Sequence, residues 1–349
     1  MEKKNFTYLI LLIWSAFLSG CDAANSTKVE KIYFWSDRDG QKQIYSMNSD
    51  GSDQQRISNL PNWDFNYSRL SPNQKYLAVV REQNRRYSIF VLTLDGTVVG
   101  KSSNFDTSDD SPSWSPDSTH IAFASSRDGH GAIYTMKLDG SEIKRLTNID
   151  GQLQTCPVWS PDGKKITFQS SEKTMVFENY VINTDGTNII NFGRSTSGSG
   201  YYCPPVSWSP NSNSVSMFGT TIVGFPEQAP GWNKYYSIQV VSPDVTLGNC
   251  TQTPPIWSHD GKRLMFFSDL CRHDFRYDIY VVNIDGTMLM NLTNNSSNNS
   301  NPIWSSDDKS IVFESDKTGN FEIFRIDSDG TDLVQLTNNL SVDIPIDWK

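Results

Sequence analysis

A short pattern recurs seven times along the chain at nearly constant spacing. Its anchor is an aromatic or aliphatic residue, usually in the string Trp-Ser-Pro-Asp or a close variant, and successive anchors are 44 to 49 residues apart. The anchors are Leu70, Trp114, Trp159, Trp208, Trp257, Trp304 and Trp348. A period in this range is typical of radial and solenoid repeats, so most residues are expected to be scaffold.

Each repeat predicts four short strands. Apolar residues stand seven and nine positions after the anchor, as Ile166 and Phe168 do after Trp159, and a spacing of two places them on one face of a strand. A Pro-Asp-Gly turn or a variant precedes this strand. A third strand with an Ile-Tyr or Ile-Phe pair follows, and an Asp-Gly turn leads into a fourth. Four antiparallel strands form one blade of a β-propeller.

The two ends of the chain predict how the ring closes. Residues 31–58 contain the second, third and fourth strands of a blade, whereas residues 344–348 look like a first strand with nothing after it. Joining them completes a blade and removes exposed sheet edges. We therefore predict an all-β, seven-bladed propeller of four-stranded blades whose termini share one blade. A six-bladed ring is the alternative if one divergent unit is not a blade.

The first residues have the features of an export signal. Lys3 and Lys4 precede a short apolar run over 8–17, and small residues follow. The ending Leu-Ser-Gly-Cys at 18–21 resembles the bacterial lipobox, which implies lipidation of Cys21. An ordinary signal peptide is the alternative. We predict a signal peptide over 1–20, a polar tether over 21–30 and a propeller over 31–349, lipid-anchored to a bacterial membrane on its periplasmic side or at the cell surface.

The charge of the chain limits its partners. The net charge of −9 disfavours binding to a nucleic-acid backbone. The hydrophobic content is 37% and the aromatic content 12%, which fits an all-β protein. We expect a monomer that contacts a lipid membrane through acylated Cys21 and binds no nucleic acid.

Two segments carry a family resemblance. The strings Trp-Ser-Pro-Asp-Gly-Lys-Lys-Ile-Thr-Phe (159–168) and Ser-Arg-Asp-Gly-His-Gly-Ala-Ile-Tyr-Thr-Met-Lys-Leu-Asp-Gly-Ser (126–141) resemble the repeat of TolB-type propellers. The resemblance covers residues 31–349 and implies the propeller fold. TolB carries an additional N-terminal domain that this chain has no room for, so the resemblance does not imply the Tol-system component itself.

Four cysteines follow the predicted lipidation site. In an exported protein an even number of cysteines indicates disulfides. We favour the pairs Cys156–Cys203 and Cys250–Cys271, although four cysteines allow three pairings. A thiolate metal site is the less favoured alternative.

Catalytic and metal-binding patterns are weak. The four histidines, His120, His130, His259 and His273, are scattered, whereas a metal needs converging ligands. No Gly-x-Ser-x-Gly motif occurs, so a hydrolase nucleophile is not expected. A cluster of Asp106, Asp109 and Asp110 could chelate calcium, although such clusters are more often solvated loops. We expect no metal, no cofactor and no enzymatic activity.

The most irregular repeat indicates a binding surface. In the fifth blade the loop over 219–234 is enlarged, and aromatic residues and arginines gather in it and in neighbouring loops. Exposed aromatics with Arg are favoured in interface hot spots. The candidate residues are Tyr201, Tyr202, Phe225, Trp232, Arg272, Arg276 and Trp63. The alternative is that Tyr201 and Trp232 merely pack against the blade.

These observations predict a membrane-tethered, non-catalytic propeller that binds an envelope protein or peptide over its loop face. The alternative is a carbohydrate-binding propeller or an enzyme similar to oligogalacturonate lyases, which are seven-bladed propellers with a His-rich metal centre. The small number of histidines favours the first prediction.

Overall fold

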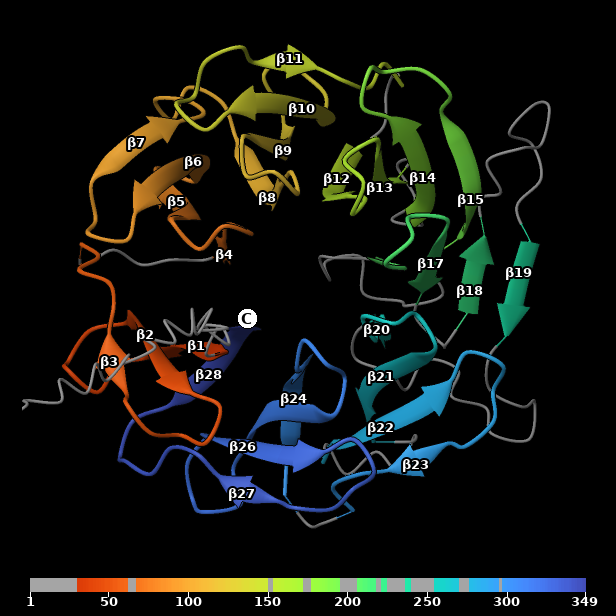
Figure 1. Ribbon diagram of the computed structural model, residues 1–349. Coiled ribbons are helices and arrows are strands. Elements are labelled where there is room, and N and C mark those ends of the chain that lie inside the picture. Colours follow the sequence, from red (N-terminus) through yellow and green to blue (C-terminus); the bar gives the residue numbers. More distant parts are fainter. Residues whose placement is uncertain are drawn as a thin grey trace, which may run out of the picture.

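The computed structural model is a closed ring of β-sheets around a central opening (Figure 1). It describes residues 30–61, 67–149, 153–171, 177–194, 206–217, 221–224, 236–239, 254–269, 276–294 and 297–349. Within these ranges the strands form seven four-stranded antiparallel sheets, which confirms the predicted propeller and the count of seven blades. None of the described residues belongs to a helix that is long and apolar enough to cross a membrane.

Each blade is numbered by its place in the ring, and its strands run from the channel outward. Blade 1 contains β28 (Asp343–Trp348), β1 (Lys31–Ser36), β2 (Gln43–Asn48) and β3 (Gln55–Arg56). Blade 2 contains β4 (Tyr67–Leu70), β5 (Tyr76–Gln83), β6 (Arg86–Thr93) and β7 (Val98–Lys101). Blade 3 contains β8 (Asp109–Trp114), β9 (His120–Ser125), β10 (Ala132–Lys137) and β11 (Lys144–Arg145).

The remaining four blades follow the same order. Blade 4 contains β12 (Leu153–Trp159), β13 (Lys165–Ser171), β14 (Phe177–Asn183) and β15 (Ile190–Arg194). Blade 5 contains β16 (Val206–Trp208), β17 (Ser214–Met217), β18 (Thr221–Gly224) and β19 (Tyr236–Gln239). Blade 6 contains β20 (Ile256–Trp257), β21 (Arg263–Ser268), β22 (Asp278–Asn283) and β23 (Met290–Asn291). Blade 7 contains β24 (Asn299–Trp304), β25 (Ser310–Ser315), β26 (Glu322–Asp327) and β27 (Val334–Gln335).

The two ends of the chain close the ring in blade 1. Strand β28 pairs antiparallel with β1, and Ile32 lies opposite Trp348. At the end of this ladder the Lys31 amide donates to the Lys349 carbonyl at 2.6 Å, and the Lys349 amide donates to the Lys31 carbonyl at 2.9 Å. The pairing confirms the predicted shared blade and covers the edge of β1 that would otherwise be open.

Strand direction gives the ring two different faces. The turns between strands one and two and between strands three and four lie on one face, which we call the turn face. The loops that enter each blade and those between strands two and three lie on the other, the loop face. In the Asp-Gly turns of the turn face the carboxylate is held locally; Ser141 donates to Asp139, and this hydrogen bond lowers the pKa of Asp139. Gly140 has φ +81°, which suits glycine at this turn.

The core lies between adjacent blades. Phe123 of blade 3 packs with Val80 and Val91 of blade 2, whereas Ala122 faces Phe168 of blade 4. Alternation along each strand therefore presents one apolar set to the preceding blade and one to the next. The burial of these faces, at roughly 25 cal/mol per Å² of apolar surface, is the main force that holds neighbouring blades together.

The repeated tryptophans join the blades around the channel. The indoles of four anchor tryptophans each donate to a backbone carbonyl on the innermost strand of the preceding blade, whereas the indole nitrogens of Trp159 and Trp348 have no partner among the described residues. These bonds run from Trp114 to Arg69 (2.9 Å), from Trp208 to Val158 (3.2 Å), from Trp257 to Ser207 (3.1 Å) and from Trp304 to Ile256 (3.4 Å). The anchors are thus scaffold, as their period predicts.

Candidate functional site

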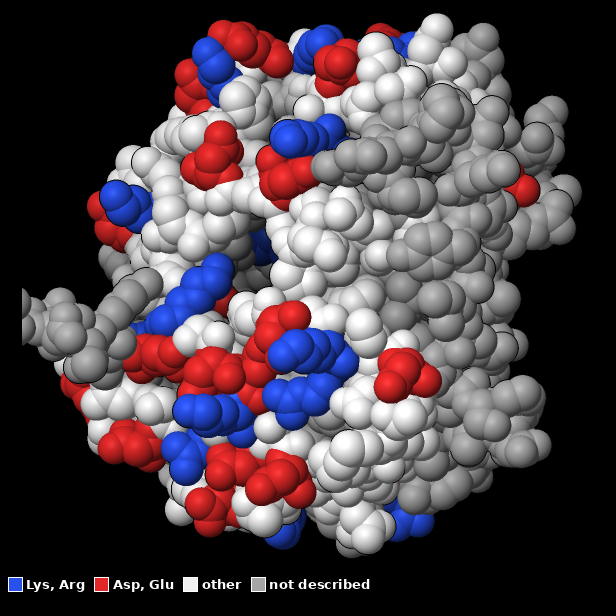
Figure 2. Space-filling model, turned by 45° about the vertical axis from the view of Figure 1, so that its right-hand side comes forward, with Lys and Arg blue, Asp and Glu red and all other residues white. Residues whose placement is uncertain are grey.

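The central channel forms a cavity of the described structure. It has a volume of about 900 Å³, and the innermost strands of all seven blades contribute to its wall. Serines, prolines and branched aliphatic residues dominate this wall, with a few charged side chains among them. Figure 2 shows a hollow near the centre of one face, around which acidic and basic side chains are interspersed. A cavity of this size can hold a ligand or a short peptide segment.

Three innermost strands bend where they line the channel. Ser111, Cys156 and Asn301 have φ of 54°, 56° and 50°, and each precedes a proline. The ladder to the second strand shifts register at each point. Non-glycine residues adopt this conformation rarely, and bulges of this kind occur where a strand must redirect a side chain. The bulges set the shape of the channel near the loop face.

We call the loop-face end of the cavity the channel mouth. It is lined by Lys42, Ser111 and Asn301. The carboxyl group of Asp110 lies behind Ser111, and that of Glu314 lies behind Asn301. The Ser111 hydroxyl is 2.9 Å from Asp110 Oδ1 and 3.3 Å from the Thr155 hydroxyl of blade 4.

Burial raises the pKa of both carboxyl groups. Burial raises the pKa of Asp110, although the hydrogen bond from Ser111 opposes the change. Burial also raises the pKa of Glu314, whose Oε1 accepts hydrogen bonds from Ser300 (2.6 Å) and Asn301 (2.9 Å). Glu314 Oε2 is buried and has no hydrogen-bond partner within the described residues.

Lys42 is the lysine of the channel mouth. It ends the loop between β1 and β2, and its ammonium lies 5.1 Å from the centre of the Trp35 ring. Burial lowers the pKa of Lys42, and the nearby Asp37 carboxylate opposes this effect. The arrangement is a cation–π contact at the edge of a cavity.

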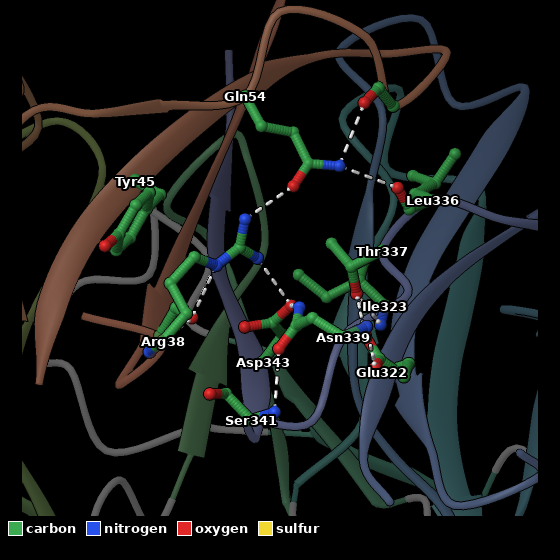
Figure 3. A network of polar contacts seen from close by, with 12 residues as sticks. Arg38, Tyr45, Gln54, Glu322, Ile323, Leu336, Thr337, Asn339, Ser341 and Asp343 are labelled. Atoms are coloured by element: carbon green, nitrogen blue, oxygen red, sulfur yellow. Dashed lines mark hydrogen bonds and ion pairs between the residues drawn. The ribbon is translucent and has the colours of Figure 1, made fainter. Parts of the chain in front are cut away.

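An arginine–aspartate pair braces the loop face in blades 1 and 3. In blade 3 the Arg127 guanidinium contacts both oxygens of the fully buried Asp109 at 3.1 Å and stacks over the rings of Phe123 and Tyr134. In blade 1 Arg38 contacts Asp343 at 2.7 Å, and Asp343 also accepts a bond from Asn339 (Figure 3). We call these two pairs the latches.

The blade 3 latch argues against the calcium alternative. Asp109 is occupied by Arg127, Ser125 and Thr107. Asp110 is turned toward Ser111, and the three carboxyl groups do not converge with one another. Within the described ranges, no group of three His, Cys, Asp or Glu side chains is placed to hold a metal ion. Asp109 therefore has a structural role in the latch.

The predicted aromatic surface lies almost entirely outside the described residues. This applies to Tyr201, Tyr202, Phe225, Trp232, Arg272 and Trp63. Arg276 is described; it is exposed on the loop face just before β22. The binding role of this group stays a prediction.

The cysteine predictions are tested only at Cys156. Cys156 is buried and disulfide-bonded. Cys21, Cys203, Cys250 and Cys271 lie outside the described residues, so both favoured pairings and the lipidation stay predictions. The position of Cys156 on the channel wall places a rigid cross-link beside the mouth.

Sequence reasoning missed the contact between Lys42 and Trp35, although a signal was present. Lys42 stands three positions before Tyr45 of the third strand, and the residue at the corresponding position is aromatic or glycine in five other blades. These residues are Tyr87, Gly131, Phe177, Tyr277 and Phe321. A lysine at this position departs from the repeat.

The comparisons with known proteins identify the family. The sequence pattern of the TolB beta propeller domain matches residues 67–225 and 243–345, which is more than half of the chain. The chain belongs to this family.

Curated relatives share part of the chain. The protein Atu1656 of Agrobacterium fabrum is 27% identical over 183 residues, which is 50% of this chain and 60% of that protein. The Tol-Pal system protein TolB of Francisella tularensis subsp. mediasiatica is 30% identical over 120 residues, which is 30% of this chain and 27% of that protein. The chain thus spans less than two thirds of the length of these relatives.

A solved structure of another protein superposes with this chain and confirms the fold. Oligogalacturonate lyase from Vibrio parahaemolyticus superposes with a TM-score of 0.60 and 15% identity, over 84% of this chain and 85% of that chain. At this identity the likeness shows the propeller fold alone.

Proposed function

We propose that this protein is a non-catalytic scaffold of the bacterial cell envelope that binds a protein or peptide segment at the channel mouth and the surrounding loop face. The observation that carries the proposal is the open channel mouth in a member of the TolB propeller family. Rigid ring scaffolds place their variable loops around such an opening, where partners can bind.

The chemistry around the mouth supports binding over catalysis. Asp109 and Asp343 are each held by an arginine in a latch, and Glu314 is held by Ser300 and Asn301. Such groups stabilise the shape of the mouth. The described histidines lie apart from the mouth's lining; His259, for example, contacts Asp308 on the turn face at 2.8 Å.

The course of the chain supports a tether on the opposite face. Lys31 is bonded to Lys349 on the turn face, so a chain that leads to an acylated Cys21 would approach the propeller from that side. We propose that the protein is a monomer, and that its loop face points away from the membrane and binds the partner. Tyr201, Tyr202, Phe225, Trp232, Arg272, Arg276 and Trp63 would extend this surface.

The test is crosslinking in intact cells followed by purification of the full chain. Ser68 lines the channel, so Ser68→Trp should obstruct it and abolish recovery of the partner. Gln55→Trp, on the exposed outer strand β3, is the matched control and should recover the partner normally. Equal recovery with both variants would contradict binding at the channel.

A further inference from the structure

Lys42 occupies a position at which packing does not require a charge. In blade 6 the corresponding residue is Tyr277, whose ring meets that of Phe267 edge-on with centroids 5.8 Å apart. Phe267 corresponds to Trp35 of blade 1, and both line the channel. An aromatic residue can therefore cover this site, as it does in blade 6. The lysine in blade 1 replaces that ring with a cation.

The cation of Lys42 is not neutralised by a bound carboxylate. Three other cations of blade 1 are paired: Lys31 with Asp53, Arg38 with Asp343 and Arg56 with Asp39. Lys42 makes no ion pair with any described residue, and Asp37 acts on it only at longer range. The Lys42 side chain is exposed, and its ammonium lies over the ring of the buried Trp35. Lys42 is thus a positioned cation that faces the cavity without a partner of its own.

We propose that Lys42, held on Trp35, binds a carboxylate of the peptide segment that enters the channel mouth. This inference rests on the proposed function and adds the chemistry of the partner. A carboxylate beside Lys42 would favour its charged form, which burial alone disfavours. An ammonium acts as a single point charge, which suits one carboxylate, whereas planar recognition of phosphate favours arginine.

The other charges of the mouth favour a segment with one isolated carboxylate. Asp110 and Glu314 lie on other walls of the same opening. Their carboxyl groups would repel a polyanion once ionised, and the chain as a whole carries a charge of −9. A segment with a single carboxylate between neutral residues would meet Lys42 and avoid this repulsion. This argument favours a peptide over an acidic oligosaccharide.

The experiment measures binding of fluorescent peptide pools to the full chain by anisotropy. One pool of random neutral octapeptides carries one central Asp or Glu and an amidated end. A second carries only a terminal carboxylate, and a third is neutral and amidated. The wild-type chain should prefer one of the two carboxylate pools over the neutral pool by about tenfold, since a hydrogen bond to a charged group contributes about this factor. The preferred pool identifies a side-chain or a terminal carboxylate.

Variants assign the preference to Lys42. Lys42→Gln should remove the preference, and Lys42→Arg should retain most of it. Lys75→Gln, on an exposed lysine of the turn face, is the control and should bind as the wild type does. Tight binding of tri-galacturonate that depends on Lys42, without peptide preference, would overturn the peptide assignment. Binding of all pools without preference would overturn this inference alone, whereas binding of none would count against the proposed function.

Discussion

Blades 1 and 3 contain the same latch but differ in how the chain reaches it. In blade 3 the paired residues Asp109 and Arg127 are 18 positions apart, whereas in blade 1 Arg38 and Asp343 are 305 apart. Both aspartates are fully buried, and both arginines stack on two aromatic rings. Arg127 contacts both oxygens of Asp109, whereas Oδ1 of Asp343 is buried without a hydrogen-bond partner among the described residues. Only the blade 1 latch joins the two ends of the chain.

This difference shows how a ring fold uses one motif for two purposes. Closing a longer loop costs more entropy, with about 0.6 kcal/mol for each doubling of its length. The latch in blade 3 joins β8 to the loop after β9, and the turn between these two strands already connects them. The latch in blade 1 helps to offset the cost of closing the whole ring, together with β28 and its ladder to β1.

The largest expected effect is the loss of the closing strand. Deletion of residues 343–349 removes β28 and exposes the edge of β1, so the free energy of unfolding should fall by about 5 kcal/mol or more, a large part of the stability of a typical domain. Thermal unfolding followed by circular dichroism measures it. Leu340→Ser, at a fully exposed position of the preceding loop, is the control and should unfold as the parent does. An unchanged transition for the deletion would contradict closure by β28.

The next effect separates the two latches. Asp343→Ala and Asp109→Ala each leave a partly buried arginine without its partner, which should cost about 3–5 kcal/mol in either blade. The two variants should differ in which strands exchange their backbone amide hydrogens faster. Exchange should rise in β1 and β28 for Asp343→Ala, but in β8 and β9 for Asp109→Ala. Identical exchange maps would show that the blade 1 latch has no special part in closure.

A pH effect concerns the two buried carboxyl groups behind the channel mouth, Asp110 of blade 3 and Glu314 of blade 7. The raised pKa of Glu314 means that the folded state holds this proton to higher pH than the unfolded state does. Stability from this group is therefore lost as pH rises from the ordinary glutamate value, about 4.3, through the raised value. Relative to the wild type, Glu314→Gln should therefore gain stability as the pH rises from 4 to 7. Asp110→Asn should behave similarly.

Urea unfolding at several pH values measures this difference. Glu142→Gln, at an exposed position of blade 3, is the control and should show no such gain. A difference between wild type and Glu314→Gln that does not vary with pH would contradict the raised pKa.

The smallest effect concerns the turn that supports the blade 1 latch. Gln54 accepts a hydrogen bond from Arg38 at 2.7 Å and donates to the Leu336 carbonyl of blade 7 at 3.0 Å (Figure 3). The corresponding residue in blade 3 is Ile143, which is exposed. Gln54→Ile should lower the unfolding free energy by about 1 kcal/mol, and the reverse change Ile143→Gln by almost nothing. Equal changes in urea unfolding would remove this distinction between the blades.

The repeat made much of the fold predictable. The anchors, the turns and the strand faces depend on neighbouring residues, and the fragment at each terminus showed which strand was missing. The site was less predictable. The departure at Lys42 is visible in the repeat, but its contact with Trp35 depends on how a loop folds over its strand. The burial of Glu314 depends on the bulge at Asn301.

The amino-acid sequence alone determined the blade, the number of its repeats and the pairing of the two terminal strands, because these follow from periodicity and from the need to cover strand edges. Only the tertiary structure decided which side chains meet at the channel mouth and which acids are held by arginines. Those contacts join residues from different blades or from opposite ends of the chain, and their energies depend on burial that exists only once the ring is closed.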